Sequence, residues 1–165
     1  MISMEFKNFY LICVYVPNSG DGLKRLDYRI HTWDKIFQKY LLNLTKEKNI
    51  ILAGDLNVAH KDIDIYDPKR HRYHAGFTIQ ERQSFSKFLL EGYVDTFRYL
   101  YPNTIKYSFF SFLGGSNYLN ENKGWRLDYF IVNNGAINNV YDSDILVDYL
   151  GSDHKPVKLI YINNK

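Results

Sequence analysis

The sequence predicts an α/β fold (α+β in the finer classification), with one mixed sheet covered by helices on one face. Two observations predict it. Before residue 101, segments with strand character alternate with segments of helical periodicity. From residue 107 onward, strand-like segments follow one another directly. This order is typical of a mixed sheet with helices packed on it, and 165 residues suffice for one domain with its own core.

The first three predicted elements are a strand, a long helix and a second strand. Residues 6–16 are rich in aromatic and β-branched side chains and end at Pro17, which predicts a strand. Residues 50–56 form a short apolar run that ends in Gly-Asp, as buried strands often do. Between them, residues 23–48 are predicted to form an amphipathic helix, because apolar side chains recur at steps of three and four: Leu26, Ile30, Trp33, Phe37, Leu41 and Leu44.

The middle of the chain is predicted to hold a loop and two further helical segments. Residues 58–76 are polar, and we expect them to be mostly loop. Thr78 followed by Glu81 is the pattern of a capping box, which predicts a helix that runs to Leu90. A short helical turn is predicted over residues 96–101.

The last third of the chain is predicted to be mainly strands, with a flexible loop over residues 114–123. The helices then cover one face of the sheet, and no predicted element covers the other. The predicted strands are residues 107–112, 127–132, 145–148 and 157–162.

Composition excludes several classes of protein. The single cysteine, Cys13, excludes an internal disulfide and a cysteine-rich zinc cluster. No apolar run reaches the length of a membrane span, so we expect no membrane partner. The formal net charge of +3 permits a polyanionic partner without requiring one.

Asp55 and Asn57 stand two residues apart at the end of the apolar run 50–56. If the chain is still extended there, their side chains leave the same face of the sheet. A carboxylate beside an amide is a hard-oxygen pair suited to Mg²⁺ and phosphate. A turn after a strand, where Asp and Asn are common, explains the pair equally well.

A second group of polar residues lies in the strand-rich part of the chain. Asp153 and His154 follow Gly-Ser, and this carboxylate–imidazole pair can bind metal or hold a developing phosphorane oxygen; a turn with an exposed histidine is the alternative. Asp128 interrupts an apolar run, where a carboxylate is costly without a partner. Its candidate partners are His154 and Arg126.

In chain order, these motifs resemble the exonuclease III type of apurinic/apyrimidinic (AP) endonuclease, in the endonuclease–exonuclease–phosphatase superfamily. The resemblance extends over nearly all of the chain, from about Glu5 to Tyr161. The segments that carry it are Tyr15-Val16-Pro17-Asn18, Gly54-Asp55-Leu56-Asn57, Gly76-Phe77-Thr78, Gly124-Trp125-Arg126-Leu127-Asp128-Tyr129 and Gly151-Ser152-Asp153-His154.

The resemblance is to the C-terminal half of that family only. Its members pack two similar sheet-and-helix halves face to face, in a four-layer α/β sandwich. Residues 1–165 are therefore expected to form a single C-terminal portion of such a domain, without the N-terminal half and its metal-binding glutamate. We expect the uncovered sheet face to meet that half, in cis or in trans, or to cause self-association.

The resemblance implies Mg²⁺-dependent hydrolysis of the DNA bond on the 5′ side of an abasic site, with Mn²⁺ as a possible substitute. Asp55 would be the general base, and Asn57 would hold the attacking water or the phosphate. His154, held by Asp128, would stabilise charge on phosphate oxygens, and Tyr15 would donate a hydrogen bond to them. The implied metal ligands are Asp55, Asn57, Asp153 and His154.

The resemblance also implies how double-stranded DNA with abasic sites is bound. Phe109, Trp125 and Leu127 match positions that form an apolar pocket for the flipped, base-less sugar. Arg25 would contact a phosphate. Plain core packing is the alternative for the three apolar residues.

Three functions stay open on the sequence alone. The first is an AP endonuclease for DNA repair, with 3′-exonuclease or 3′-phosphodiesterase action as further activities. The second is a truncated fragment that binds DNA or a partner but cannot cut. The third is another phosphodiesterase or phosphatase of the same superfamily. Relatives of the first kind imply an intracellular location: nucleus or organelle in a eukaryote, cytoplasm in a bacterium.

Overall fold

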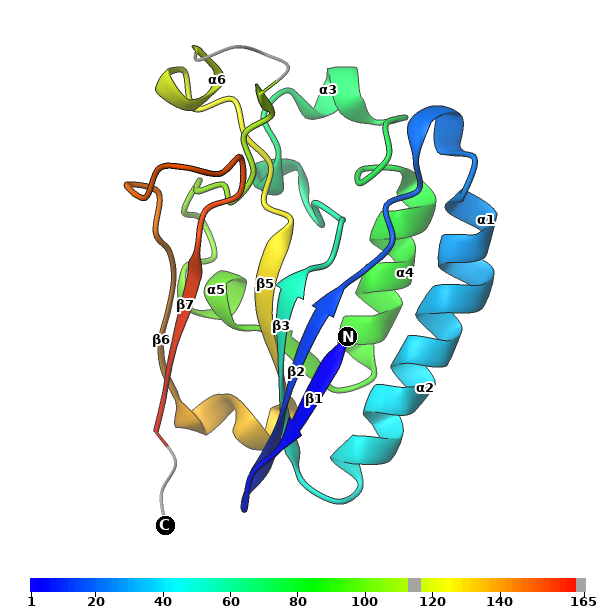
Figure 1. The fold of residues 1–165 in the computed structure, drawn as a ribbon, viewed down its shortest axis with the longest axis vertical. Helices are drawn as coiled ribbons and strands as arrows, with labels where there is room; N and C mark the ends of the chain where they lie inside the picture. The colour runs from blue at the N-terminus through cyan, green and yellow to red at the C-terminus, as the bar shows by residue number, and fades with distance from the viewer. Residues whose placement is uncertain (113–116, 163–165) are drawn as a thin grey trace.

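The computed structural model describes residues 1–112 and 117–162. Its centre is a mixed five-stranded sheet, as predicted, in which β2 and β3 run parallel and the other neighbours run antiparallel (Figure 1). The strands, in their order across the sheet, are β1 (Ile2–Glu5), β2 (Phe9–Tyr15), β3 (Asn49–Asp55), β5 (Asp128–Asn133) and β4 (Tyr93–Asp95).

Helices pack on one face of this sheet, as predicted (Figure 1). The first consists of α1 (Leu26–Tyr28), a π-helical turn (Arg29–Trp33) and α2 (Asp34–Thr45). The second is α4 (Ile79–Leu90), which Thr78 caps through the predicted capping box with Glu81. Their apolar side chains form one core with the sheet; its buried members include Ile12, Leu41, Leu52, Phe85 and Tyr129.

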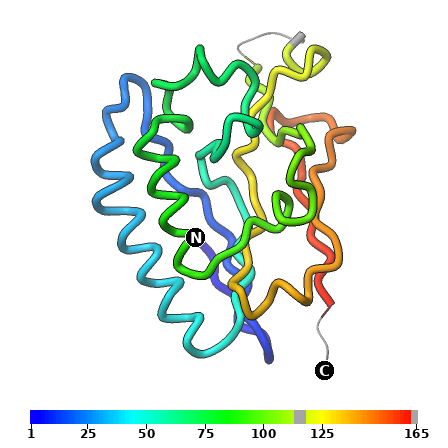
Figure 2. The backbone as a smooth tube through the Cα atoms, turned by 180° about the vertical axis from the view of Figure 1, so that it is seen from behind, coloured from blue at the N-terminus to red at the C-terminus, as the bar shows by residue number. Residues whose placement is uncertain are grey.

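The other face is covered in part by a two-stranded sheet, β6 (Val140–Ile145) and β7 (Val157–Tyr161), after a 3₁₀ segment at Asn134–Asn139. Leu159 and Tyr161 of β7 pack on this face around buried Ile51 and Val132. The expectation that no element of this chain covers the second face is therefore wrong. Sheet-on-sheet packing is a usual way to bury such a face, and Figure 2 shows these strands beside the main sheet.

Two of the predicted strands are placed wrongly. Residues 107–112 form only isolated bridges, because Ser108 and Phe109 both donate to Trp125 O while Phe110 donates to Asp153 O. The hydrogen-bond partner of this segment changes within three residues, so no continuous β-ladder forms. The strand predicted at 145–148 lies earlier, as β6, where the polar Asp142 and Asp144 form ion pairs with lysines on neighbouring segments.

The strand predicted at 6–16 is present as β2, but it begins three residues later, at Phe9. The chain turns at residues 6–8, so that β1, which was not predicted, pairs antiparallel with β2. The remaining short helices are α3 (Pro68–His71), α5 (Thr96–Leu100) and α6 (Asn117–Asn120), and 3₁₀ turns occur at Asp21–Leu23 and Asp62–Asp64. Part of the loop predicted at 114–123 lies outside the described residues, and α6 occupies some of the rest. No helix within the described ranges is long and apolar enough to span a membrane.

Candidate active site

Asp55 ends β3 where that strand passes very close to β2. A Cβ on the preceding Gly54, whose φ is +135°, would lie 2.0 Å from Val14 O, so only glycine fits there. This close contact fixes the end of β3 against β2. It places Asp55 opposite Tyr15 of β2 on one side and Asp128 of β5 on the other.

Asn57 contacts Asp55, but not through the extended backbone that the sequence analysis considered. The chain is not extended there, because Asn57 adopts a left-handed conformation with φ +49°. Its backbone N–H donates to Asp55 Oδ1 (2.8 Å) and its Nδ2 to Asp55 Oδ2 (3.0 Å) and Val16 O (2.8 Å). Asn18 Nδ2 donates in turn to Asn57 Oδ1 (2.9 Å). The carboxylate–amide pair is thus held in one orientation.

Asp128 and His154 form the second half of the site. His154 Nδ1 lies 2.8 Å from Asp128 Oδ2, which confirms His154 as the partner. Arg126, the alternative, is only 1% exposed and pairs instead with Asp64 and Asp95. The hydrogen bond to Asp128 raises the pKa of His154, against the lowering effect of burial.

The two halves are linked electrostatically. The pKa of Asp55 is raised to about 6, first by burial and second by the neighbouring Asp128 carboxylate. Asn57 N–H, His154 and Arg29 act in the opposite direction. A carboxyl group with such a pKa can accept a proton near neutral pH, as a general base must.

Ser108 joins the segments that carry Asp128 and His154. It is fully buried, and its Oγ accepts hydrogen bonds from the N–H groups of Leu127 (3.0 Å) and Asp128 (2.9 Å). Its carbonyl accepts from Lys155 N (2.7 Å). Nothing in the local pattern of the sequence singles this serine out, because its role depends on contacts between distant segments.

A cavity of about 810 Å³ opens over these groups. It brings together seven of the residues that the sequence analysis selected: Tyr15, Asp55, Asn57, Phe109, Trp125, Leu127 and His154. Asp128 lies behind His154. Arg25 and Asp153 do not line the cavity. Arg25 is exposed beside Gly20, and the Asp153 carboxylate accepts a hydrogen bond from Ser152 Oγ at 3.5 Å.

The apolar wall of the cavity is also a small core. Leu127 is 6% exposed and packs with Ile65 and Phe77, against which Phe109 and Trp125 also lie. These residues therefore line the cavity and pack as a small core at the same time. Arg126, anchored by Asp64 and Asp95, fixes the backbone between Trp125 and Leu127.

The cavity is also lined by residues to which the sequence analysis gave no role. His71 lies between Tyr66 (ring centroids 4.9 Å apart) and Trp125 (5.1 Å). Its ring nitrogens are buried without a hydrogen-bond partner among the described residues. Burial lowers the pKa of His71, and nearby His74 lowers it further. Its neighbours Lys69, Arg70 and Arg72 are exposed, so His71 alone of these four residues turns toward the cavity.

The Asp55–Asn57 pair could supply oxygen ligands for a metal. Their carboxylate and amide oxygens are the type that hard divalent cations prefer, and a cation would relieve the buried charge of Asp55. Across residues 1–112 and 117–162, no group of three or more His, Cys, Asp or Glu side chains is arranged to hold a metal.

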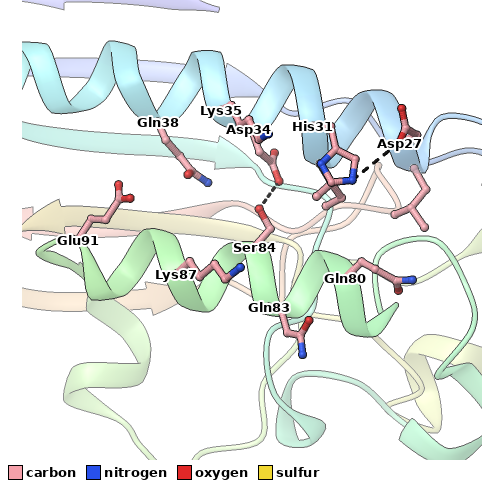
Figure 3. A pocket seen from close by; sticks show the side chains of 12 residues that line it. Asp27, His31, Asp34, Lys35, Gln38, Gln80, Gln83, Ser84, Lys87 and Glu91 are labelled. Atoms are coloured by element: carbon pink, nitrogen blue, oxygen red, sulfur yellow. Dashed lines mark hydrogen bonds and ion pairs between the residues drawn. The ribbon is translucent and has the colours of Figure 1, made fainter.

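A second cavity, of about 640 Å³, lies between the α1–α2 helix and α4, away from this site (Figure 3). Its walls are long polar side chains such as Gln38, Gln83 and Lys87, and Asp34 bonds to Ser84 across it (2.6 Å). It contains none of the residues selected above. The cavity over Asp55 is therefore the candidate active site.

Comparison with known proteins gives one consistent result. The family model described as "Endonuclease/Exonuclease/phosphatase family" matches residues 4–154. The chain is 45% identical over 161 residues to an exodeoxyribonuclease of Bacillus subtilis (strain 168), covering 97% of this chain and 63% of that protein. It is 47% identical over 163 residues to a DNA-(apurinic or apyrimidinic site) endonuclease of Dictyostelium discoideum, covering 97% of this chain and 45% of that protein.

Solved structures agree with the sequence comparisons. The AP endonuclease LMAP from Leishmania major superposes with a TM-score of 0.88 at 37% identity, covering 94% of this chain and 50% of that one. An AP endonuclease from Archaeoglobus fulgidus superposes with a TM-score of 0.86 at 23% identity, over 96% of this chain and 63% of that one, and supports the fold alone. The chain spans less than two thirds of the length of each of these proteins.

Proposed function

The chain belongs to the endonuclease/exonuclease/phosphatase family, and on that premise we propose that it acts in DNA repair as part of a divalent-metal-dependent nuclease. The bond it hydrolyses is the DNA phosphodiester on the 5′ side of an abasic sugar. The observation that carries the proposal is the Asp128–His154 pair beside Asp55, at the ends of adjacent strands and under one cavity with an apolar wall.

The proposed chemistry assigns one task to each polar side chain. Asp55 accepts the proton of the attacking water, and Asn57 holds Asp55 and the water or phosphate in place. His154 in its protonated form, favoured by Asp128, stabilises charge on the phosphate oxygens. Tyr15 is 61% exposed at the rim of the cavity, where its hydroxyl can donate to phosphate.

We propose that Asp55 and Asn57 hold the divalent cation, with Asp153 and His154 as further candidate ligands. Mg²⁺ is the expected ion and Mn²⁺ a substitute. The bound ion would neutralise negative charge where the phosphate reacts. The names of two relatives, a DNA-(apurinic or apyrimidinic site) endonuclease and a recombination repair protein, support the DNA-repair part of the proposal.

Selectivity for abasic DNA is proposed to come from the apolar wall. Phe109, Trp125 and Leu127 form a surface beside His154 that suits a sugar without a base. Lys123, which lines the same cavity and forms an ion pair with Glu121, carries a positive charge for the DNA backbone.

The test is cleavage of a 5′-labelled duplex with one abasic-site analogue, compared with the same duplex carrying a normal nucleotide, both with Mg²⁺. We expect one product, ending in a 3′-hydroxyl on the 5′ side of the abasic site, and no cut in the normal duplex. Trp125→Ala should reduce this preference. Equal cutting of both duplexes contradicts the proposed substrate. Binding without cutting favours the alternative of a DNA-binding fragment.

A further inference from the structure

The helix that begins near the active site is interrupted by a π-helical turn at Arg29–Trp33. Asp34 N–H donates to Arg29 O, five residues back, in place of the α-helical spacing of four. Side chains five apart diverge by about 140° in a regular α-helix, and the wider turn brings those of Arg29 and Asp34 together. Such turns are uncommon and often occur at functional sites.

Arg29 uses this turn to reach the main chain of the active site. The residue is 3% exposed although its side chain carries a charge. Its guanidinium donates to Leu56 O (2.7 Å), Asn57 O (3.2 Å) and Pro17 O (3.0 Å). These carbonyls belong to the two segments that follow β2 and β3, so one side chain joins the ends of both strands.

The carbonyls that Arg29 binds flank the strained part of the site. Asn57 has a left-handed backbone, and its side chain orients Asp55. Asn18, next to Pro17, donates to Asn57 Oδ1. If Arg29 were shortened, these carbonyls would lose their donors in a buried place, and the turn would relax toward an ordinary conformation.

Arg29 is itself held from the outside. Its Nε lies 3.2 Å from Asp34 Oδ1, while Asp34 Oδ2 accepts from Ser84 of α4 at 2.6 Å (Figure 3). Asp34 also lines the second cavity, between the α1–α2 helix and α4. Asp34 and Arg29 therefore connect that cavity to the active site. The full set of contacts satisfies most of the guanidinium donors.

We infer that Arg29 is a positioning residue of this nuclease site: it fixes the Pro17–Asn18 and Leu56–Asn57 segments so that Asn57 can orient Asp55. It does not line the cavity over Asp55, so we assign it no direct contact with substrate. Its effect on the reaction passes through the backbone that it binds. The catalytic part of this inference rests on the proposed function, and the structural part does not.

The experiment uses the full chain with Arg29→Lys, which keeps the charge and loses the planar fork of donors. Arg98→Lys is the matched control. Arg98 is 7% exposed, donates to three carbonyls (Tyr101, Pro102 and Thr104), and pairs with Asp64, but it does not contact either strand end of the site. Asp34→Asn is a milder second variant, in case Arg29→Lys does not fold.

The first readout is amide hydrogen exchange, which needs no activity. We expect Arg29→Lys to accelerate exchange in peptides spanning 16–19 and 55–59 selectively, Asp34→Asn to do so less, and Arg98→Lys to leave those peptides unchanged. The inference is overturned if these two peptides exchange in Arg29→Lys at the wild-type rate. It is also overturned if their exchange rates rise no more in Arg29→Lys than in Arg98→Lys.

The second readout is cleavage of the abasic duplex. Arg29→Lys should lower kcat by about 10- to 100-fold, as small misplacements of catalytic groups do, with little change in KM; Arg98→Lys should keep its kcat. An unchanged kcat in Arg29→Lys overturns the inference. If the wild-type chain does not cut at all, the proposed function fails, and the exchange result alone decides the positioning role.

Discussion

At the scale of single residues, Asp55 and His154 are given different protonation behaviour by their surroundings. Burial and a neighbouring carboxylate disfavour the charged form of Asp55. The hydrogen bond to Asp128 favours the charged form of His154. A base that is easily protonated beside a histidine that keeps its proton is the arrangement expected of an acid–base pair.

Asp55→Asn tests the cost of the buried charge. The folded-state pKa of Asp55, about 6, lies above its ordinary value of 3.8, so the folded state binds the proton more tightly than the unfolded state. The free energy of unfolding should therefore fall as pH rises from about 4 to 6, by at most about 2 kcal/mol from this group. Urea unfolding in EDTA at several pH values should show this fall in wild type.

In Asp55→Asn the same dependence should flatten, because the titrating carboxyl is gone. Asp62→Asn is the control, since Asp62 is exposed and forms only a surface pair with Arg82. If the free energy of unfolding of Asp55→Asn falls with pH as steeply as that of wild type, the pH dependence belongs to another group.

Asp128→Asn tests the origin of the His154 pKa. Removing the carboxylate leaves burial as the main influence, and burial disfavours the charged imidazole. We expect the pKa of His154 to fall in this variant. Titration of the imidazole C–H signals by NMR measures it, with His154→Gln used to assign the signal. A pKa that does not move would show that Asp128 does not favour the protonated form.

Much of the site could be predicted at this scale, but not all of it. Asp55 and Asn57 lie in one short motif and contact each other, while the pairing of Asp128 with His154 followed from the cost of an unpaired carboxylate in an apolar run. Arg29 and Ser108 could not be found in this way, because each acts through main-chain atoms of distant segments.

At the scale of elements, helix α4 depends on its capping box. Thr78 Oγ1 accepts from Glu81 N (3.3 Å) and donates to Glu81 Oε2 (2.6 Å), and Glu81 also accepts from Ser19 Oγ beside the active-site segment. Thr78 and Glu81 are both buried. Loss of the Thr78 hydroxyl therefore also disturbs Glu81 and, through Ser19, the segment that follows β2.

Thr78→Ala should therefore lower the free energy of unfolding by about 1–2 kcal/mol, the usual range for a lost N-cap. Thr104→Ala, an exposed loop position, is the control and should change it little. Chemical denaturation measures both. Equal stabilities of the two variants would contradict the role of the cap.

Local signals explain which elements the sequence could predict. Helix α4 and strand β3 carry their own caps or apolar runs, and both were predicted. Strands β1 and β4 were missed because they are short and are defined by pairing with β2 and β5. Residues 107–112 have strand-like composition, yet their hydrogen bonds go to two different segments.

At the scale of the whole molecule, the sheet face opposite the helices is covered unevenly. Sheet β6–β7 packs near its centre. On β1, Ser3 bonds to Tyr40 of α2, so Ile2 and Met4 face the other way. They are 64% and 38% exposed, on an edge strand.

An exposed apolar edge of this kind favours association. We expect the sedimentation coefficient to rise with protein concentration, and the variant Ile2→Lys with Met4→Lys to suppress that rise. Ile36→Lys is the control, because Ile36 is 67% exposed but lies on helix α2. Association that is equally sensitive to Ile36→Lys would contradict the assignment to β1.

The central claim is that Asp55, Asp128 and His154 form the reactive part of a metal-dependent, DNA-cutting site. Its most direct measurement is cleavage of a duplex with one abasic-site analogue by wild type, Asp55→Ala and the surface control Asp62→Ala, with Mg²⁺ and with EDTA. We predict cutting by wild type and Asp62→Ala in Mg²⁺, none in EDTA, and a loss of at least about 100-fold in Asp55→Ala. Cutting that survives in EDTA or in Asp55→Ala, or no cutting by the folded wild-type chain, would contradict the account.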